Sequence, residues 1–294
     1  MSKASVGGRI AIGANYVFLG ALSLLTLFPF WYEVVASFSS SRAISAGEVS
    51  LWPIEFNVEA YKRLIEDGQI FKAAQNTILV TAVGTVLNMV MTIMAAYPLS
   101  KRRLRGRTPL TLFITFTMLF AAGIIPNFIL IKQLGLMNSY WALWLPGLIG
   151  TYNMFVMKTF FEGLPEEIEE SASIDGANDI SILLKIVMPL SKPILAALSL
   201  FYAVGWWNVY FNVLLYITKS TKQTLTVKLY YMIKQFDPKL ISTVGGSEGV
   251  TQVTLTPEAV QAAAIVIAVT PILCVYPFLQ RHFVKGVLIG SVKG

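Results

Sequence analysis

EGLPEEIEESASIDGANDISILLKIVMPLSKP, residues 162–193, is a polar segment between two long apolar stretches. Pro165 stands where the first turn of a helix tolerates proline. Four glutamates follow it, at the end where the helix dipole favours anions. Gly176 interrupts the pattern, and Asn178 or Asp179 can cap a second helix. The segment therefore predicts two short helices joined at a glycine.

Both predicted helices are amphipathic. Ile168 and Ala172 are four residues apart in the first, and the second has apolar residues at the spacing of one helical face: Ile180, Leu183, Leu184 and Val187. The acidic first helix would be repelled by anionic lipid headgroups. The segment therefore favours docking of the helices into a groove on a protein partner.

The composition excludes a soluble protein with a single core. Of 294 residues, 55% are hydrophobic and 13% are charged, against about 25% charged in soluble domains. The single cysteine, Cys274, excludes a disulfide scaffold. With only one histidine, His282, no zinc or haem site built on histidine and cysteine is expected.

Six apolar stretches are long enough to cross a bilayer, so we predict an all-α membrane protein with six transmembrane helices. They run over residues 14–35, 76–99, 109–131, 140–161, 193–217 and 259–279. The predicted organisation is a cytoplasmic N-terminus (1–13), a membrane domain (14–281) and a cytoplasmic tail (282–294).

The short loop 100–108, SKRRLRGRT, gives the predicted orientation. It has five basic residues and no acidic one, which is typical of a cytoplasmic loop. Both termini and the 162–193 segment then lie inside, and the connections 37–75 and 218–258 lie outside. Basic residues flanking apolar spans account for the net charge of +7, so no nucleic-acid partner is expected. In the first outer connection, Asn57 can cap a helix over 58–65 that ends near Gly68.

The 162–193 segment resembles the EAA loop of ABC importer permeases, whose pattern is EAA, three residues, G, nine residues, I, one residue, LP. Glu170-Ser171-Ala172 fills the first block, Gly176 follows after three residues, and nine more lead to Ile186 and then Met188-Pro189. Ser171 and Met188 depart mildly from the pattern.

The resemblance covers nearly the whole chain. LPEE (164–167), IDGA (174–177) and PLSKP (189–193) look like the carbohydrate-uptake branch, to which the maltose importer belongs. The ending FVKGVLIGSVKG (283–294) is similar to the tail of the shorter, six-span permease of such importers. This implies the fold of a type I ABC importer permease with a cytoplasmic EAA coupling loop.

The family implies several partners in a bacterial inner membrane. They are a second homologous permease, two ATP-binding subunits and a periplasmic or lipid-anchored solute-binding protein. Because the sequence has no GxxxxGK[ST] phosphate loop, we expect ATP and Mg²⁺ to be bound by the partner ATPases and not by this chain. The chain is thus predicted to be a non-enzymatic transport subunit that binds no cofactor.

The resemblance also implies which residues couple the permease to the ATPase. Glu170 would pair with a cation on the ATPase or within the loop, and Gly176 would allow the sharp joint, where any side chain strains the backbone. Ile168, Ala172 and Leu183 would fill the docking cleft. The motif residues Ser171, Asp175, Ile186 and Pro189 complete the coupling set. In the tail, the second expected ATPase contact comprises Lys285, Gly286 and Lys293.

Polar and aromatic residues within the spans are candidates for the substrate pathway, because sugars bind to aromatic faces and polar side chains. They are Asn127, Tyr152, Asn153, Tyr202, Trp206, Asn208 and Asn212. The spacing puts Asn208 and Asn212 on one helix face, beside Tyr202 and Trp206. Helix packing or interfacial anchoring is an equally good interpretation of each aromatic residue.

The substrate is open at this stage. Loop 131–147 looks most like permeases for oligosaccharides cut from polysaccharides, with fragments of uronic-acid polymers such as alginate or pectin as candidates. The loop 218–258 falls where the family has a loop that enters the binding protein's cleft, and its lysines would suit an acidic sugar.

Three alternatives remain. A permease for amino acids or another small solute would share the coupling loop. A secondary transporter driven by an ion gradient would favour mid-membrane charges or a repeat, and the sequence shows neither clearly. A membrane-embedded enzyme would need a catalytic cluster, for which the residues are missing.

Overall fold

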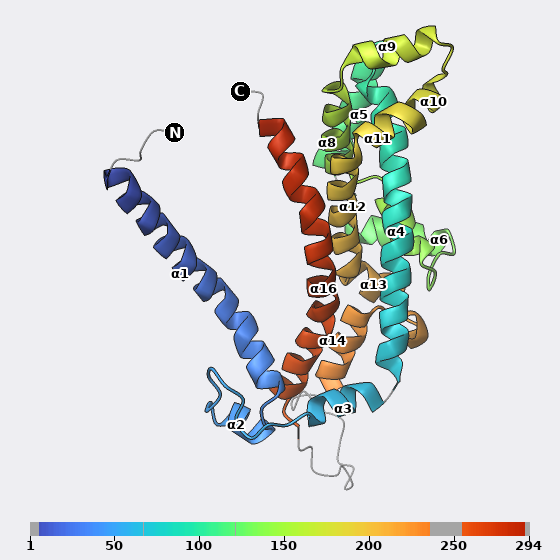
Figure 1. Ribbon diagram of the computed structural model, residues 1–294. Helices are drawn as coiled ribbons and strands as arrows, with labels where there is room; N and C mark the ends of the chain where they lie inside the picture. Colours follow the sequence, from blue (N-terminus) through green and yellow to red (C-terminus); the bar gives the residue numbers. More distant parts are fainter. Residues whose placement is uncertain (1–5, 67, 121, 236–254, 292–294) are drawn as a thin grey trace. The chain divides into compact units, whose positions relative to one another are not determined.

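The computed structural model describes residues 6–66, 68–120, 122–235 and 255–291, and the regular structure in these ranges is helical (Figure 1). The chain divides into two compact units. The first comprises residues 1–68 and 229–270, and the second comprises residues 69–228 and 271–294.

The first unit contains α1 (Val6–Ser37), α2 (Ser41–Ser45) and α3 (Glu59–Glu66), together with the beginning of α16 (Pro257–Ser291). A small apolar cluster joins the end of α1 to α2 and α16 through Val35, Ala43 and Ala262. The predicted helix after Asn57 is confirmed as α3. The Asn57 side-chain oxygen accepts a hydrogen bond from the backbone N–H of Glu59 at 2.6 Å.

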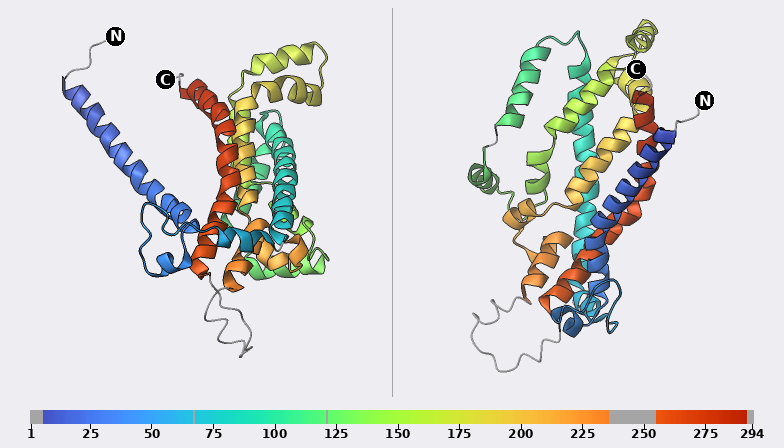
Figure 2. Two further views of the ribbon diagram at one scale, coloured as in Figure 1. Left: turned by 60° about the horizontal axis from the view of Figure 1, so that its bottom comes forward. Right: turned by 90° about the vertical axis from the view of Figure 1, so that its left-hand side faces the viewer.

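The second unit is built around α4 (Gln69–Ser100), α8 (Thr151–Glu162) and α12 (Lys192–Trp207), which lie side by side in the views of Figures 1 and 2. Their contact surface is apolar and buried, with Met89 and Tyr97 from α4, Met154 from α8 and Leu198 from α12. The other helices are α5 (Arg107–Leu119), α6 (Ile124–Gln133), α7 (Trp141–Trp144), the 3₁₀ turn η1 (Leu145–Gly147), α13 (Phe211–Tyr216), the 3₁₀ turn η3 (Ser220–Lys222) and the start of α14 (Leu225–Gln235).

Three helices are unbroken and apolar enough to cross a membrane among the described residues: Ile12–Ser37, Gln69–Ser100 and Pro257–Cys274. They coincide with the first, second and sixth predicted spans. In addition, two pairs of consecutive helices are bent sharply at a short break, and the number of spans rises to five if each pair counts as one span. One pair is α5 with α6, which meet at 108° within the third predicted span. Gly123 precedes α6 with φ +87°, a conformation that glycine adopts readily.

The remaining two predicted spans are less regular than the sequence indicates. The fourth, 140–161, is divided into α7, η1 and α8, with Pro146 inside the 3₁₀ turn. The fifth, 193–217, is divided into α12 and α13, and α12 is bent by 84° from the residues before it. Hydropathy detects such stretches but does not detect where the helix breaks.

A buried asparagine in α4 links three parts of the second unit. The Asn88 amide donates hydrogen bonds to the carbonyls of Gly147 and Leu148, and its oxygen accepts one from the indole N–H of Trp206. The same indole packs directly against Gly84, one turn earlier on α4. Glycine at position 84 thus permits close approach of α12 to α4.

We expect Gly84→Ala to destabilise the protein. A Cβ at this position would lie 2.6 Å from two atoms of the Trp206 indole, so the ring must move and its hydrogen bond to Asn88 must change. Overpacking of this kind costs about 1–3 kcal/mol. The matched control is Gly205→Ala on α12, because a Cβ there meets no atom within 4 Å. Thermal unfolding in detergent should show a lower Tm for the first variant only, and equal Tm values would contradict the argument.

Candidate functional site: the coupling loop

The first helix of the 162–193 segment is α9 (Glu166–Ile174), which Pro165 precedes with an extended backbone. It ends in a Schellman motif: the N–H of Ala177 donates to the carbonyl of Ala172 at 3.0 Å, and the N–H of Gly176 donates to the carbonyl of Ser173 at 3.1 Å. This motif requires a left-handed residue, and Gly176 has φ +83°. The predicted glycine joint is confirmed.

The second helical part runs through α10 (Asp179–Ile182), a π-helical turn η2 (Leu183–Val187) and α11 (Met188–Leu190). Asn178 is the N-cap, and its side chain accepts a hydrogen bond from the N–H of Ser181 at 2.8 Å. The predicted apolar face is wrong in part. Ile180 and Leu184 are exposed, whereas Ile182 and Val187 are buried. The wide π turn rotates later residues away from the 3.6-residue period.

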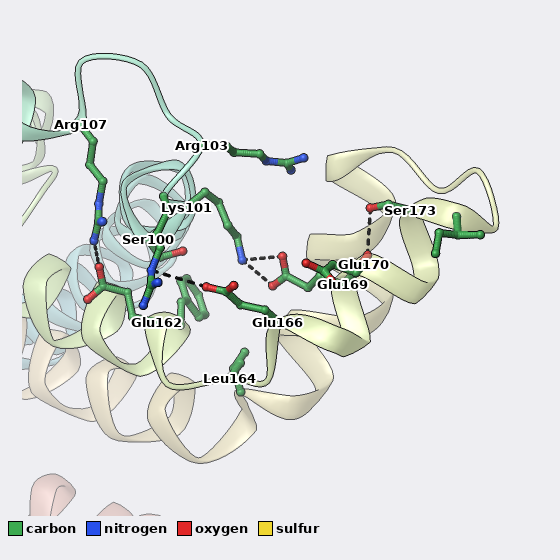
Figure 3. Close-up of a pocket in the computed structure, with 13 residues that line it drawn as sticks. Ser100, Lys101, Arg103, Arg107, Glu162, Leu164, Glu166, Glu169, Glu170 and Ser173 are labelled. Carbon is green, nitrogen blue, oxygen red and sulfur yellow. Dashed lines mark hydrogen bonds and ion pairs between the residues drawn. The ribbon is translucent and has the colours of Figure 1, made fainter.

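Four ion pairs connect the coupling loop and its flanks to the basic loop that follows α4. Figure 3 shows the Lys101–Glu169 and Arg107–Glu162 pairs among them. Lys101 pairs with Glu169, Arg102 with Glu166 at 3.7 Å, Arg103 with Asp179, and Arg107 with Glu162. We call these four pairs the charge clamp. Basic residues that the sequence associates with membrane orientation are therefore also counter-ions of the coupling loop.

The pairs of the charge clamp differ in burial. The Lys101 and Glu169 side chains are 18% and 16% exposed, whereas those of Arg102 and Glu166 are 85% and 70% exposed. The Lys101 ammonium also lies 4.6 Å from the centre of the Tyr97 ring. Exposed pairs contribute about 0–1 kcal/mol, so the least exposed pair, Lys101–Glu169, should contribute most to the clamp, ahead of Arg107–Glu162 at 30% and 29% exposed. Its position ties α9 to the last turn of α4.

A cavity of about 830 Å³ separates the basic loop from α9. Charged side chains of both signs line it, among them Lys101, Arg107, Glu162 and Glu169. Figure 3 shows these side chains converging from the two loops. The cavity therefore belongs to the charge clamp.

The outward side of the loop carries apolar side chains. Ile174, the last residue of α9, is 86% exposed, and Ile180 and Leu184 are also exposed. Of the three predicted cleft-filling residues, Ile168 is exposed. Ala172 and Leu183 are partly buried against this chain's own core, and their place in the docking cleft stays a prediction.

The remaining motif residues occupy the surface or the helix interior. Glu170 and Asp175 are exposed, and neither forms an ion pair within the part of the chain that the structure describes. The Ser171 hydroxyl donates to the carbonyl of Glu167 at 2.8 Å. Ile186 is half-buried and Pro189 is exposed. The acid at position 170 is therefore available to a partner.

Two of the pathway candidates are engaged inside the protein. Tyr202 is buried, and its hydroxyl lies 2.7 Å from the Thr92 hydroxyl and accepts a bond from the N–H of Gly150 at 3.3 Å. The Trp206 indole is bonded to Asn88. Their polar groups hold helices together, as the alternative interpretation expected.

The predicted face with Asn208 and Asn212 is wrong. Helix α12 ends at Trp207 with Asn208 as its C-cap, and α13 begins only at Phe211, so the two asparagines lie on different elements. Tyr152 and Asn127 are exposed, and Asn153 is half-buried. These exposed groups remain candidates for the pathway.

Only part of the 218–258 loop and of the C-terminal tail belongs to the described residues. Lys285 and Gly286 belong to α16, where only the backbone of this part is described. Lys293 lies outside the described residues. Residues 236–254 of the 218–258 loop also lie outside them.

Sequence reasoning missed three features of the site: the Lys101–Glu169 pair, the exposure of Ile174 and the buried Asn88. The sequence could have indicated the Lys101–Glu169 pair, because a loop with five basic residues and no acidic one occurs in the same chain as a loop rich in glutamate. Sequence spacing gives no signal for Asn88, since its partners lie 59 to 118 residues away.

Comparison with known proteins extends this description. A family model described as "binding-protein-dependent transport system inner membrane component" matches residues 72–289. Protein LplC of Bacillus subtilis is 41% identical over 289 residues, covering 98% of this chain and 96% of that protein. The polygalacturonan/rhamnogalacturonan transport system permease protein YtcP of the same organism is 41% identical over 282 residues, covering 95% of this chain and 96% of that protein.

A solved structure is also similar. It is a chain of a bacterial ABC transporter involved in the import of the acidic polysaccharide alginate, with 33% identity and a TM-score of 0.84. The match covers 96% of this chain and 100% of that one. The family model includes α4 from residue 72 onward, the charge clamp and the whole coupling loop. This chain belongs to the family of inner-membrane components of binding-protein-dependent transport systems, the permease subunits of ABC importers.

Proposed function

We propose that this permease passes an acidic, polysaccharide-derived oligosaccharide across the inner membrane, and that α9 transmits the work of ATP hydrolysis to the membrane helices. The single observation that carries the coupling role is the charge clamp. It fixes α9 to the end of α4, while Ile174, Ile180 and Glu170 remain free on the outer side of the loop.

The proposed assembly has two ATP-binding subunits, a second permease and a solute-binding protein on the opposite side. ATP and Mg²⁺ are bound by the ATP-binding subunits, because this sequence has no phosphate loop. Both termini are cytoplasmic in this proposal. Its support is the basic 100–108 loop, which pairs with the coupling loop and so lies at the same end of the second unit.

The substrate class rests on two relatives. YtcP is named for polygalacturonan and rhamnogalacturonan, and the similar structure is involved in alginate import. Polygalacturonan and alginate are polymers of uronic acids. We therefore propose uronate oligosaccharides as the substrates, with exposed Lys219 and Asn127 as candidate polar contacts along the pathway.

Reconstitution tests the proposed function. The complete transporter in proteoliposomes is supplied with binding protein and ATP, and uptake of oligogalacturonate, alginate oligosaccharide and neutral maltodextrin is compared. We expect uronate oligosaccharides to stimulate ATP hydrolysis and to accumulate inside, and maltodextrin to do neither. Uptake of maltodextrin alone would overturn the substrate class. Uptake that follows a proton or sodium gradient without ATP would favour the secondary transporter.

We expect Ile174→Asp to weaken docking of the ATPase. Ile174 is the most exposed large apolar side chain of α9, and a charge there would be buried without a partner on docking. Loss of a central apolar contact costs about 2 kcal/mol or more, equivalent to roughly thirtyfold in affinity. Co-purification of the ATPase measures this, with Glu167→Gln as the control, because Glu167 is an exposed residue of the same helix outside the coupling set. Unchanged co-purification of the Ile174 variant would place the interface elsewhere.

A further inference from the structure

Helix α4 packs into two separate apolar cores, one after the other along its length. Val80 and Leu87 belong to the core that α6, α7 and α13 complete, which we call the distal core. Met89 and Tyr97 belong to the core that α8, α12 and the coupling loop complete, which we call the coupling-loop core. The residue between Leu87 and Met89 is Asn88, so the boundary of the two cores on α4 falls at a buried polar side chain.

The helices around α4 are interrupted between the same two cores. Helices α5, α8 and α12 contribute to the coupling-loop core, whereas α6, α7 and α13 contribute to the distal core. The third, fourth and fifth predicted spans each have one part in either core, and the chain between the parts leaves the α-helix. Helix α4 continues from Gln69 to Ser100 without such a break. The two cores are therefore joined by α4 and by the contacts made at the breaks.

Two of these breaks meet at Asn88. Trp206, in the last turn of α12, packs against both cores and donates its indole N–H to the Asn88 oxygen. The Asn88 amide donates to the carbonyl of Leu148 at 2.9 Å and to that of Gly147, which lie in the turn between α7 and α8. One side chain of α4 thus holds the end of α12 and this turn together.

Helix α12 connects this junction directly to the coupling loop. Ser191 stands at the 84° bend before α12 and is buried. Its N–H donates to the carbonyl of Val187 at 2.9 Å, and its carbonyl accepts from the N–H of Leu195 at 3.0 Å, so hydrogen bonds cross the bend. Trp206 lies 14 residues after Lys192, about 21 Å along the axis at about 1.5 Å per residue. A displacement of the coupling loop therefore reaches Trp206 through a single helix.

We propose that Asn88 is a positioning residue, which relays movement between α12 and the distal core through its bonds to Trp206 and to the 147–148 turn. The inference rests on the proposed function, in which α9 moves with the ATPase and the solute-binding protein acts at the opposite side. Because unpaired polar groups are costly in an apolar interior, the bonded groups remain paired and shift together. The signal of a loaded binding protein passes the same boundary in the reverse direction.

ATP hydrolysis by the complete transporter in proteoliposomes tests the relay. It is measured with and without binding protein, loaded with whichever of oligogalacturonate, alginate oligosaccharide and maltodextrin stimulates the wild type, so a wrong substrate class does not affect the comparison. Asn88→Leu removes all three hydrogen bonds with a side chain of similar size. We expect stimulated hydrolysis to fall at least fivefold, with basal hydrolysis and co-purification of the ATPase unchanged. Trp206→Phe removes the N–H but keeps an aromatic ring, and stimulation should fall in the same direction.

The matched control is Tyr202→Phe, one turn earlier on α12. It removes a hydroxyl that lies 2.7 Å from the Thr92 hydroxyl and accepts from the N–H of Gly150, but Tyr202 belongs to the coupling-loop core. We expect a lower Tm in all three variants and loss of stimulation only in those at 88 and 206.

Two results would overturn the relay. Full stimulation of Trp206→Phe would show that its bond to Asn88 transmits nothing, and this variant decides the question even if Asn88→Leu does not fold. An equal loss in Tyr202→Phe would show that packing of α12 on α4 as a whole is needed and that Asn88 has no special part.

Discussion

Replacing Gly176 by valine should abolish the stimulation of ATP hydrolysis by substrate. The residue has φ +83° and closes the Schellman motif at the end of α9. A β-branched side chain in this conformation costs about 1–3 kcal/mol, so the joint would change its geometry and α9 would tilt relative to α10. We expect at least a tenfold loss of stimulated hydrolysis in proteoliposomes, with the permease still folded.

Gly176→Asn separates the two reasons for which glycine can be needed. A Cβ at position 176 meets no atom of this chain within 4 Å, so only backbone strain acts within the permease. Asparagine tolerates the left-handed conformation far better than valine does. If strain alone matters, the asparagine variant should keep most of the stimulation.

Loss of stimulation in both variants would instead indicate that the ATPase approaches the joint too closely for any side chain. Full stimulation of the valine variant would show that the joint is not part of the coupling mechanism. Co-purification of the ATPase with each variant distinguishes failed docking from failed transmission.

Reversing the charge at position 101 should uncouple the transporter nearly as strongly. Lys101→Glu places two carboxylates together at a site where both side chains are mostly buried. The cation above the Tyr97 ring is lost as well. Breaking a fully buried pair costs about 3–5 kcal/mol and an exposed one about 0–1, so an intermediate value of about 2 kcal/mol is expected. The measurement is substrate-stimulated hydrolysis together with Tm.

The double variant Lys101→Glu with Glu169→Lys restores opposite charges, and we expect it to recover most of the coupling. The matched control is Arg102→Glu, because the Arg102–Glu166 pair is 3.7 Å long and highly exposed. Its effect should be within about 0.5 kcal/mol, as for surface substitutions generally. Equal losses for Arg102→Glu and Lys101→Glu would show that loop charge matters and the individual pair does not. Failure of the double variant to recover would contradict a direct role of the pair.

The sequence by itself determined the class of protein and the local construction of the coupling loop. Apolar stretches of sufficient length indicate membrane spans, and the positive φ of Gly176 and the cap at Asn178 depend on residues within one or two turns. Such local features are decided by backbone sterics and near-neighbour hydrogen bonds, which spacing expresses directly.

Only the tertiary structure decided which side chains face the core, which face a partner and which charges meet. Ala172 turns inward, Ile174 turns outward, and the tyrosine at 202 bonds to Thr92 instead of lining an open path. Lys101 and Glu169 are 68 residues apart in the chain, so their pairing depends on how α4, α8 and α9 pack. A π turn also shifts the face of the second helix. These outcomes depend on long-range packing, which neither the hydrophobic period of a helix nor a sequence motif predicts.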